Sequence, residues 1–133
     1  MVGLISSCGG SEEAREPTAL DPARVNEGRE IFRFETFGDE SKWTDTLRMH
    51  EVIAAAVDPM TALSVGLKVD AEALPATVVQ GIQSGAVDLK SPATTITLLK
   101  LNAVVGLRGV VTTDAAGKDT LARVGVTCAL CHS

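Results

Sequence analysis

The sequence predicts a mainly α-helical fold with one β-hairpin. Asp-Pro and Ser-Pro pairs, which are typical of helix starts, precede several stretches of the chain that we expect to be helical. Near the carboxy terminus, two runs rich in β-forming residues flank a short polar loop. The 133 residues, 45% of them hydrophobic, suit a single globular domain. No apolar run approaches the roughly 18–20 residues that cross a bilayer.

The first half of the chain predicts two helices. Asp21-Pro22 opens a helix that runs to about Glu35, because Asp accepts a hydrogen bond at the helix start and Pro suits the first helical position. A second helix is expected from about Asp39 to Val57, where Asp58-Pro59 stops it. Its apolar stripe follows a spacing of three and four residues and comprises Trp43, Leu47, His50, Ala54 and Val57, with Met49 at its edge.

The second half predicts shorter elements. The alternation over 64–70 is typical of a half-buried strand. Asp70 and Pro75 precede a short helix that runs to Gln83 before Gly85, and Ser91-Pro92 starts another that runs to about Leu101. Two strands then form the hairpin: Val104–Thr112 and Thr120–Thr127, joined by the loop 113–119.

The charge balance argues against a nucleic-acid partner. Twelve basic residues are scattered among seventeen acidic ones, which gives a net charge of −5. A surface that binds phosphates needs a clustered surplus of Lys and Arg.

The strongest chemical motif is Cys128-Ala129-Leu130-Cys131-His132, which is C-x-x-C-H, the attachment signature of a c-type haem. One helical turn brings both thiols to the same side of a porphyrin, where each forms a thioether with one vinyl group. The adjacent His132 then offers a ring nitrogen to the iron as its axial ligand. Three other interpretations remain: a structural zinc site completed by Cys8 and His50, a thiol–disulfide redox pair, and a chance occurrence of the motif.

The end of the chain resembles bacterial c-type cytochromes, and Gly28-Arg29-Glu30-Ile31-Phe32 is similar to part of the first helix of the class I cytochrome c domain. In that family this helix leads almost directly into the C-x-x-C-H motif. Here 33–127 intervene, either as a large insertion or because the chain has an amino-terminal domain of its own and the five-residue match is fortuitous. The resemblance implies covalent haem c, iron bound by His132, redox partner proteins and haem attachment after export to the periplasm.

The resemblance also implies a sixth iron ligand, usually a methionine and sometimes a histidine that follows the motif. Only one residue follows His132, so the candidates within the chain are His50, Met60 and Met49. Each is also a natural packing residue. The four aromatic residues offer the same two interpretations, a wall for the haem or part of the core, and the core is favoured: Phe32, Phe34, Phe37 and Trp43.

The amino terminus resembles a bacterial lipobox, Leu4-Ile5-Ser6-Ser7-Cys8, in which the cysteine is lipidated. Residues 9–20 have the composition of a flexible linker. Because a secretory signal needs a longer apolar run than the residues before Cys8, we expect 1–8 to be a truncated signal. The alternative is a free cysteine in a leader. We expect 21–133 to be the amino-terminal part of an incomplete cytochrome c-like domain that ends at its haem motif.

These observations predict a c-type cytochrome of the bacterial envelope that carries single electrons, located in the periplasm or attached to the outer membrane through a lipid on Cys8. One alternative is a peroxidase-like haem oxidoreductase module of a multi-haem protein. The other is a lipoprotein binding module whose terminal motif holds zinc or no cofactor.

Overall fold

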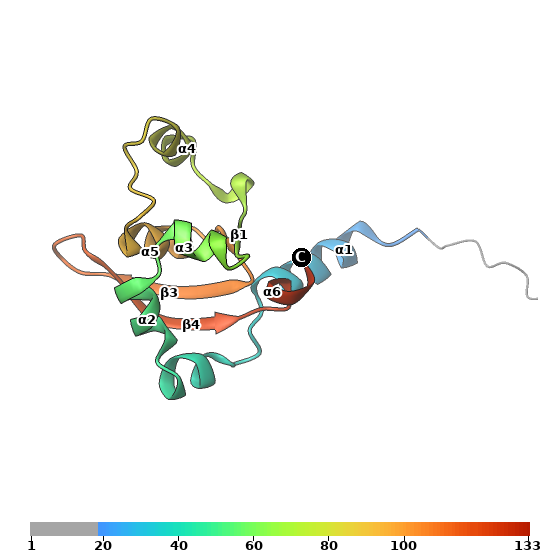
Figure 1. Cartoon of the computed structure of the whole chain (residues 1–133). Coiled ribbons are helices and arrows are strands. Elements are labelled where there is room, and N and C mark those ends of the chain that lie inside the picture. The colour runs from blue at the N-terminus through green and yellow to red at the C-terminus, as the bar shows by residue number, and fades with distance from the viewer. Residues whose placement is uncertain (1–18) are drawn as a thin grey trace, which may run out of the picture.

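The computed structural model describes residues 19–133, and about 50% of it is helical. Figure 1 shows the order of the elements along the chain. The helices are α1 (Pro22–Phe34), the π-helix η1 (Ser41–Thr46), α2 (Met49–Ala56), α3 (Pro59–Ser64), the 3-10 helix η2 (Ala71–Ala73), α4 (Ala76–Gln83), α5 (Pro92–Lys100) and α6 (Ala129–His132). The strands are β1 (Lys68–Val69), β2 (Val104–Val105), β3 (Leu107–Thr113) and β4 (Asp119–Val126).

The long hairpin of β3 and β4 is the platform on which the main helices pack. The two strands are antiparallel, with Leu107 opposite Val126 and Thr113 opposite Asp119. Helix α5 packs on β3, and α2 packs on both α5 and β4. Strands β1 and β2 form a separate two-residue antiparallel pair. The fold is therefore mainly α-helical with a β-hairpin, as the sequence predicts.

The core lies where α2, α5 and the hairpin meet. Leu99 of α5 and Val124 of β4 are almost completely buried, and Ile53 of α2 packs in the same cluster. Gly109 of β3 allows α5 to approach closely, because a Cβ at this position would lie 2.9 Å from the Cβ of Leu99. The apolar contacts thus hold the centre of the hairpin against two helices.

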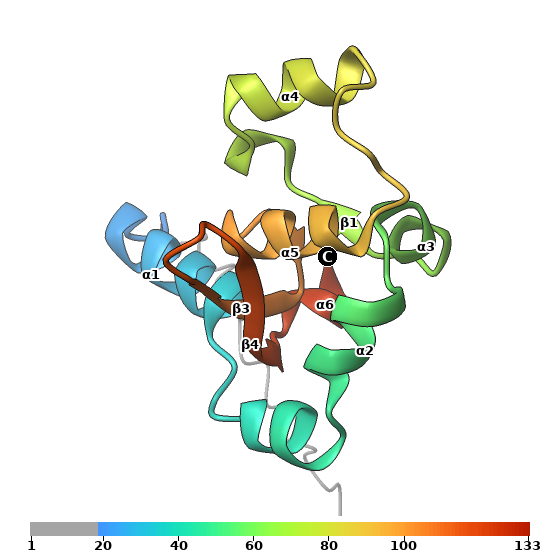
Figure 2. The same cartoon turned by 90° about the vertical axis from the view of Figure 1, so that its left-hand side faces the viewer.

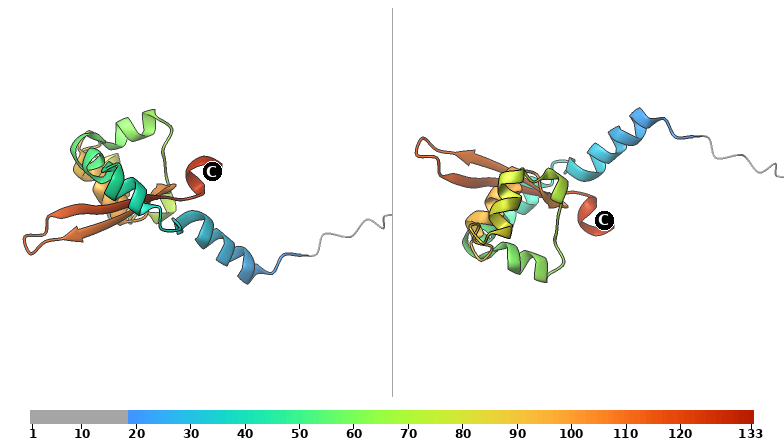
Figure 3. Two further views of the ribbon diagram at one scale, coloured as in Figure 1. Left: turned by 90° about the horizontal axis from the view of Figure 1, so that it is seen from below. Right: turned by 90° about the horizontal axis from the view of Figure 1, so that it is seen from above.

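Two helices lie outside this core. Helix α1 projects away from the hairpin, as Figure 3 shows, and it contains no buried residue. Its carboxy-terminal end is tied to the body by Arg33, which donates a hydrogen bond of 2.8 Å to the Asp70 carboxylate. Helix α4 stands apart on the other side of α5 in Figure 2 and also contains no buried residue. No helix within 19–133 is long and apolar enough to span a membrane.

Several predicted elements are confirmed. The helices expected after Asp21, Pro75 and Ser91 correspond to α1, α4 and α5, and Asp21 accepts the capping hydrogen bond from the backbone nitrogen of Ala23 at 3.0 Å. The Ser91 side chain makes no capping hydrogen bond, and its backbone carbonyl accepts from Thr94 instead. The hairpin is also present, but it begins at Leu107 because Gly106 separates β2 from β3.

The prediction of a single helix over 39–57 was wrong, because η1 and α2 occupy this segment. Arg48 adopts a left-handed conformation with φ 53°, which ends the π-helix η1 and starts α2 in a new direction. The predicted stripe therefore does not continue across the break: Leu47 and Ala54 are exposed, whereas Ile53 is buried. A continuous periodicity assumes continuous helical angles, and one left-handed residue changes the face that later residues present.

Two smaller expectations also needed correction. Asp58-Pro59 ends α2, but it also starts α3, because the Asp58 carboxylate accepts a hydrogen bond from the backbone nitrogen of Thr61 at 2.9 Å. The strand expected over 64–70 is reduced to Lys68–Val69, since α3 extends to Ser64 and β2 offers only two residues for pairing.

Candidate functional site

The C-x-x-C-H motif forms the short helix α6 and its first cap. Cys128 is the cap residue, and Ala129–His132 complete one helical turn. Both cysteines are free thiols and both are exposed, as is His132. The single helical turn predicted for the motif is therefore present.

The two faces of α6 differ in exposure. With about 100° per residue, Cys128, Cys131 and His132 fall within an arc of about 100°, and the two intervening residues point to the opposite side. Ala129 is fully buried and Leu130 is 37% exposed. The helix thus packs against the domain through its two spacer residues, and it presents both thiols and the imidazole outward.

The end of the hairpin holds α6 in place. The backbone nitrogen of Thr127, which follows β4, donates to the carbonyl oxygen of Gly106 at 3.0 Å. The backbone nitrogen of Leu130 then donates to the carbonyl of Thr127 at 3.1 Å. Asp39 supports the same strand end, because its carboxylate accepts from the backbone nitrogen of Val126 at 3.1 Å and from the Trp43 indole at 2.9 Å.

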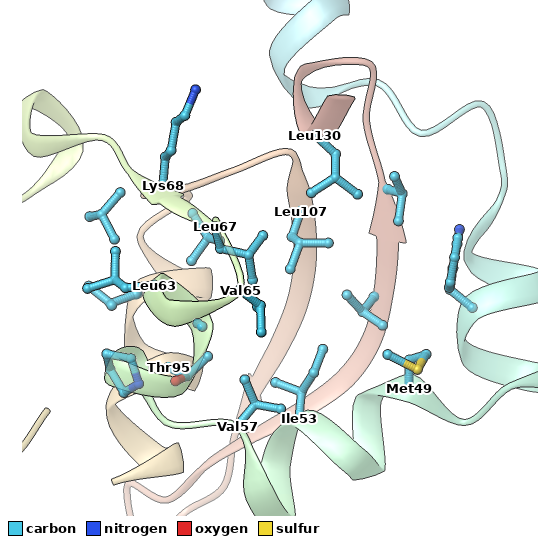
Figure 4. Close-up of a pocket in the computed structure, with 18 residues that line it drawn as sticks. Met49, Ile53, Val57, Leu63, Val65, Leu67, Lys68, Thr95, Leu107 and Leu130 are labelled. Atoms are coloured by element: carbon cyan, nitrogen blue, oxygen red, sulfur yellow. The ribbon is translucent and has the colours of Figure 1, made fainter. Parts of the chain in front are cut away.

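An apolar cavity of about 290 Å³ lies behind α6. Leu130 and Leu107 lie at one end of it, and Ile53 and Met49 of α2 lie at the other, as Figure 4 shows. Val65, Leu67 and Val69, the apolar residues of the predicted strand 64–70, also line it, together with Pro59, Ala62, Leu63 and Val104. Because Leu130 faces this cavity, the thiols and the imidazole face away from it.

The exposed face of α6 fits the attachment of a haem. A porphyrin with two vinyl groups needs two unpaired thiols and one imidazole on the same side of one helical turn. Cys128, Cys131 and His132 meet this requirement, because both thiols are unpaired and all three residues are exposed. Across 19–133, no group of three or more His, Cys, Asp and Glu side chains is arranged to hold a metal ion. An axial haem ligand needs no such group.

The three candidates for the sixth iron ligand lie in different surroundings. Met49 is half-buried and lines the cavity. The His50 side chain is 21% exposed, with its Nε2 atom 3.8 Å from the Glu51 carboxylate, and its buried Nδ1 atom has no hydrogen-bond partner among the described residues. Met60 is 49% exposed on α3. Neither His50 nor Met60 lines the cavity, and all three remain predicted ligands.

The four aromatic residues differ in burial and do not form one cluster. Trp43 packs against the core and lines the cavity, as favoured from the sequence. Phe34 lies under the guanidinium groups of Arg33 and Arg108, at 5.5 Å and 5.6 Å from its ring centre. Phe37 is 71% exposed, so its expected place in the core was wrong, because it occupies a left-handed turn with φ 54°. Phe32 is half-buried.

Charged groups near the hairpin end have shifted pKa values with clear causes. The hydrogen bond from the Thr36 hydroxyl, at 2.6 Å, lowers the pKa of Glu40. Burial raises the pKa of Asp70, but hydrogen bonds from Arg33 and from the backbone of Glu72 outweigh it, so the pKa is lowered overall. Both carboxylates are therefore held in their charged forms.

Sequence reasoning missed the residues that orient the motif. Gly106, Ala129, Leu130 and Asp39 position α6, although none belongs to the haem signature. The only sequence signal was Gly106 itself, an interruption within a β-rich run that is typical of a bend or a close backbone approach. The predicted lipidation at Cys8, the signal 1–8 and most of the linker 9–20 lie outside the described residues.

Comparison with models of known protein families gave no match, and neither the curated proteins nor the solved structures gave one.

Proposed function

We propose that this chain is a c-type cytochrome of the bacterial envelope, in which Cys128 and Cys131 hold a haem covalently and His132 binds its iron. The observation that carries this proposal is the one-sided arrangement of α6, with two free, exposed thiols and an exposed imidazole on the same face of one turn. The spacer residues of the same turn are directed into the domain.

Each residue has a separate task in this proposal. The thiols anchor the ring at two points and fix its orientation to α6. The imidazole supplies one axial nitrogen. Once bound, the haem supplies the Fe(III)/Fe(II) couple, which accepts one electron from a donor protein and passes one electron to an acceptor protein. The exposed position of α6 lets a redox partner approach this face closely.

We also propose that the domain is cytochrome c-like and that it lies in the periplasm or is attached to the outer membrane. Haem attachment to C-x-x-C-H in the related cytochromes takes place after export, which favours the periplasm. The lipobox-like sequence that ends at Cys8 supports attachment of the chain to a membrane through a lipid.

The test is to export the chain in a bacterium that carries haem-attachment machinery. We expect covalent haem on a denaturing gel and the absorption spectrum of a c-type haem in alkaline pyridine. The variant with Cys128→Ser and Cys131→Ser should lose covalent haem completely, whereas Cys8→Ser, which removes the remaining cysteine, should retain it. His132→Ala should alter the spectrum of the bound haem.

Absence of covalent haem from the exported wild-type protein contradicts the proposal. In the haem-loaded protein, binding of carbon monoxide to the reduced haem then tests whether the sixth iron position is occupied. Slow or absent binding indicates an occupied position, as in an electron carrier. Rapid binding favours the oxidoreductase alternative.

A further inference from the structure

Gly106 lies in direct contact with the backbone of the motif helix. It is buried between β2 and β3 and adopts φ +87°, a conformation that residues other than glycine rarely adopt. A Cβ atom at this position would overlap the Cα atom of Leu130 and lie 2.5 Å from its backbone nitrogen. Because these atoms are backbone, a rotation of the Leu130 side chain cannot relieve the overlap.

The same residue also holds the entry to α6. Its carbonyl oxygen accepts the hydrogen bond from the backbone nitrogen of Thr127, one residue before Cys128. Ala129, on the packed side of the helix, has no exposed surface. Three features therefore hold α6 against the domain in this orientation: the contact at Gly106, the hydrogen bond at Thr127 and the burial of Ala129.

We infer that Gly106 is a positioning residue for the haem-attachment motif. The close backbone approach that glycine permits determines which face of α6 is packed and which is presented outward. It thereby fixes the direction of Cys128, Cys131 and His132. The role of those three residues rests on the proposed function, whereas the contact between Gly106 and α6 stands independently of it.

A side chain at position 106 must force the backbones of residue 106 and Leu130 apart. We expect α6 to move as a body, because it is one short turn at the end of the described chain. The thiols and the imidazole then move relative to the hairpin, while their spacing within the turn is retained. A misplacement of about 1 Å in reacting groups can reduce a rate about a hundredfold. Haem attachment should therefore suffer more from this substitution than the stability of the domain does.

The test compares Gly106→Ala with Gly117→Ala in the exported chain. Gly117 lies in the loop between β3 and β4 and has φ +81°, so alanine meets a similar backbone strain there, but its Cβ would contact nothing within 4 Å. We expect Gly106→Ala to carry roughly tenfold less covalent haem per folded protein than Gly117→Ala. The haem that remains should show altered absorption bands.

A second measurement uses the haem-free protein. Hydrogen exchange at the Thr127 and Leu130 amides should accelerate at least roughly tenfold in Gly106→Ala and remain at the wild-type rate in Gly117→Ala. If the wild type carries no haem, the proposed function fails, and this exchange still decides whether Gly106 positions α6. Equal haem content and equal exchange in the two variants would overturn the inference.

Should Gly106→Ala fail to fold, Ala129→Val tests whether the packed side of α6 sets the direction of the motif, because it adds volume at a residue with no exposed surface. A similar loss of haem per folded protein, with faster exchange at Leu130, supports the inference. Wild-type haem content in a folded Ala129→Val protein overturns it.

Discussion

At the scale of single residues, two buried threonines of the core have opposite hydrogen-bonding states. The Thr44 hydroxyl donates to the backbone carbonyl of Val124 and accepts from its backbone nitrogen, both at 2.9 Å. The Thr95 hydroxyl, on α5, is buried and has no partner among the described residues. The Thr44 hydroxyl therefore satisfies both backbone groups of Val124. The Thr95 hydroxyl has lost its hydrogen bonds to water, and no new hydrogen bond offsets that cost.

The same substitution should change stability in opposite directions at these two positions. Thr95→Val keeps the shape and removes the unpaired hydroxyl, so the free energy of unfolding should rise by about 1 kcal/mol. Thr44→Val leaves both backbone groups of Val124 buried and unpaired, so it should fall by about 2 kcal/mol or more. Urea unfolding followed by circular dichroism measures both changes. A loss of stability in Thr95→Val would mean that its hydroxyl has a partner.

At the scale of elements, the break between η1 and α2 depends on Arg48. This residue adopts φ 53° and ψ 34°, and within residues 19–133 its exposed guanidinium bonds only to Glu51 in the next turn. A left-handed conformation costs an ordinary residue about 1 kcal/mol, whereas glycine adopts it without strain. The exposed ion pair contributes little in return.

Arg48→Gly should therefore raise the free energy of unfolding by a few tenths to about 1 kcal/mol. The gain stays below the full strain because glycine also makes the unfolded chain more flexible. Arg48→Ala is the matched control: it removes the ion pair but retains the strain, and it should leave stability unchanged or slightly lower. A clear loss in Arg48→Gly, as measured by thermal unfolding, would show that the arginine side chain matters more than its backbone conformation.

This break also shows how far the elements follow from the sequence. The helix start at Asp21 depends on local capping, which neighbouring residues determine, and the sequence predicted it. Asp58 caps α3 in the same way, but Asp58-Pro59 was interpreted only as the end of the preceding helix. The conformation of Arg48 depends on tertiary packing: Thr44 bonds to β4 on one side of the break and Ile53 enters the core on the other. No local pattern contains that information, so the sequence predicted one helix in place of two.

At the scale of the whole molecule, one property of the candidate site follows from the local sequence and another depends on long-range contacts. The spacing of Cys128, Cys131 and His132 along the chain already predicts that they share one face of a helical turn. The direction of that face depends on Gly106, which is 24 residues away from Leu130 in sequence and meets it only in the fold. Long-range contacts of this kind leave no periodic signal, and for this reason the orientation of the motif could not be predicted.

The attachment of α1 to the body is a further property of the whole molecule, and it depends on pH. Arg33 and Asp70 are only 18% and 21% exposed, and their hydrogen bond links α1 to the segment between β1 and η2. Because the net effect of the surroundings is to lower the pKa of Asp70, the folded state binds its proton more weakly than the unfolded chain. The stabilisation is therefore present above pH 3.8, the ordinary value for this carboxyl, and is lost as the pH falls below it.

Asp70→Asn should accordingly lower the free energy of unfolding by about 1 kcal/mol at neutral pH and by less at a pH well below 3.8, because the wild-type carboxyl is protonated as the pH falls through its lowered pKa. Urea titrations of both proteins at the two pH values measure the difference. Asp45→Asn is the control, since its ion pair with Arg123 is exposed on both sides and should contribute little at either pH. A cost of Asp70→Asn that stayed the same at both pH values would show that the charge of the carboxylate does not contribute to the attachment of α1. If the cost falls with pH as expected, the charged hydrogen bond from Arg33 helps to hold the carboxy-terminal end of α1, alongside half-buried Phe32 and the contact between Phe34 and Arg108.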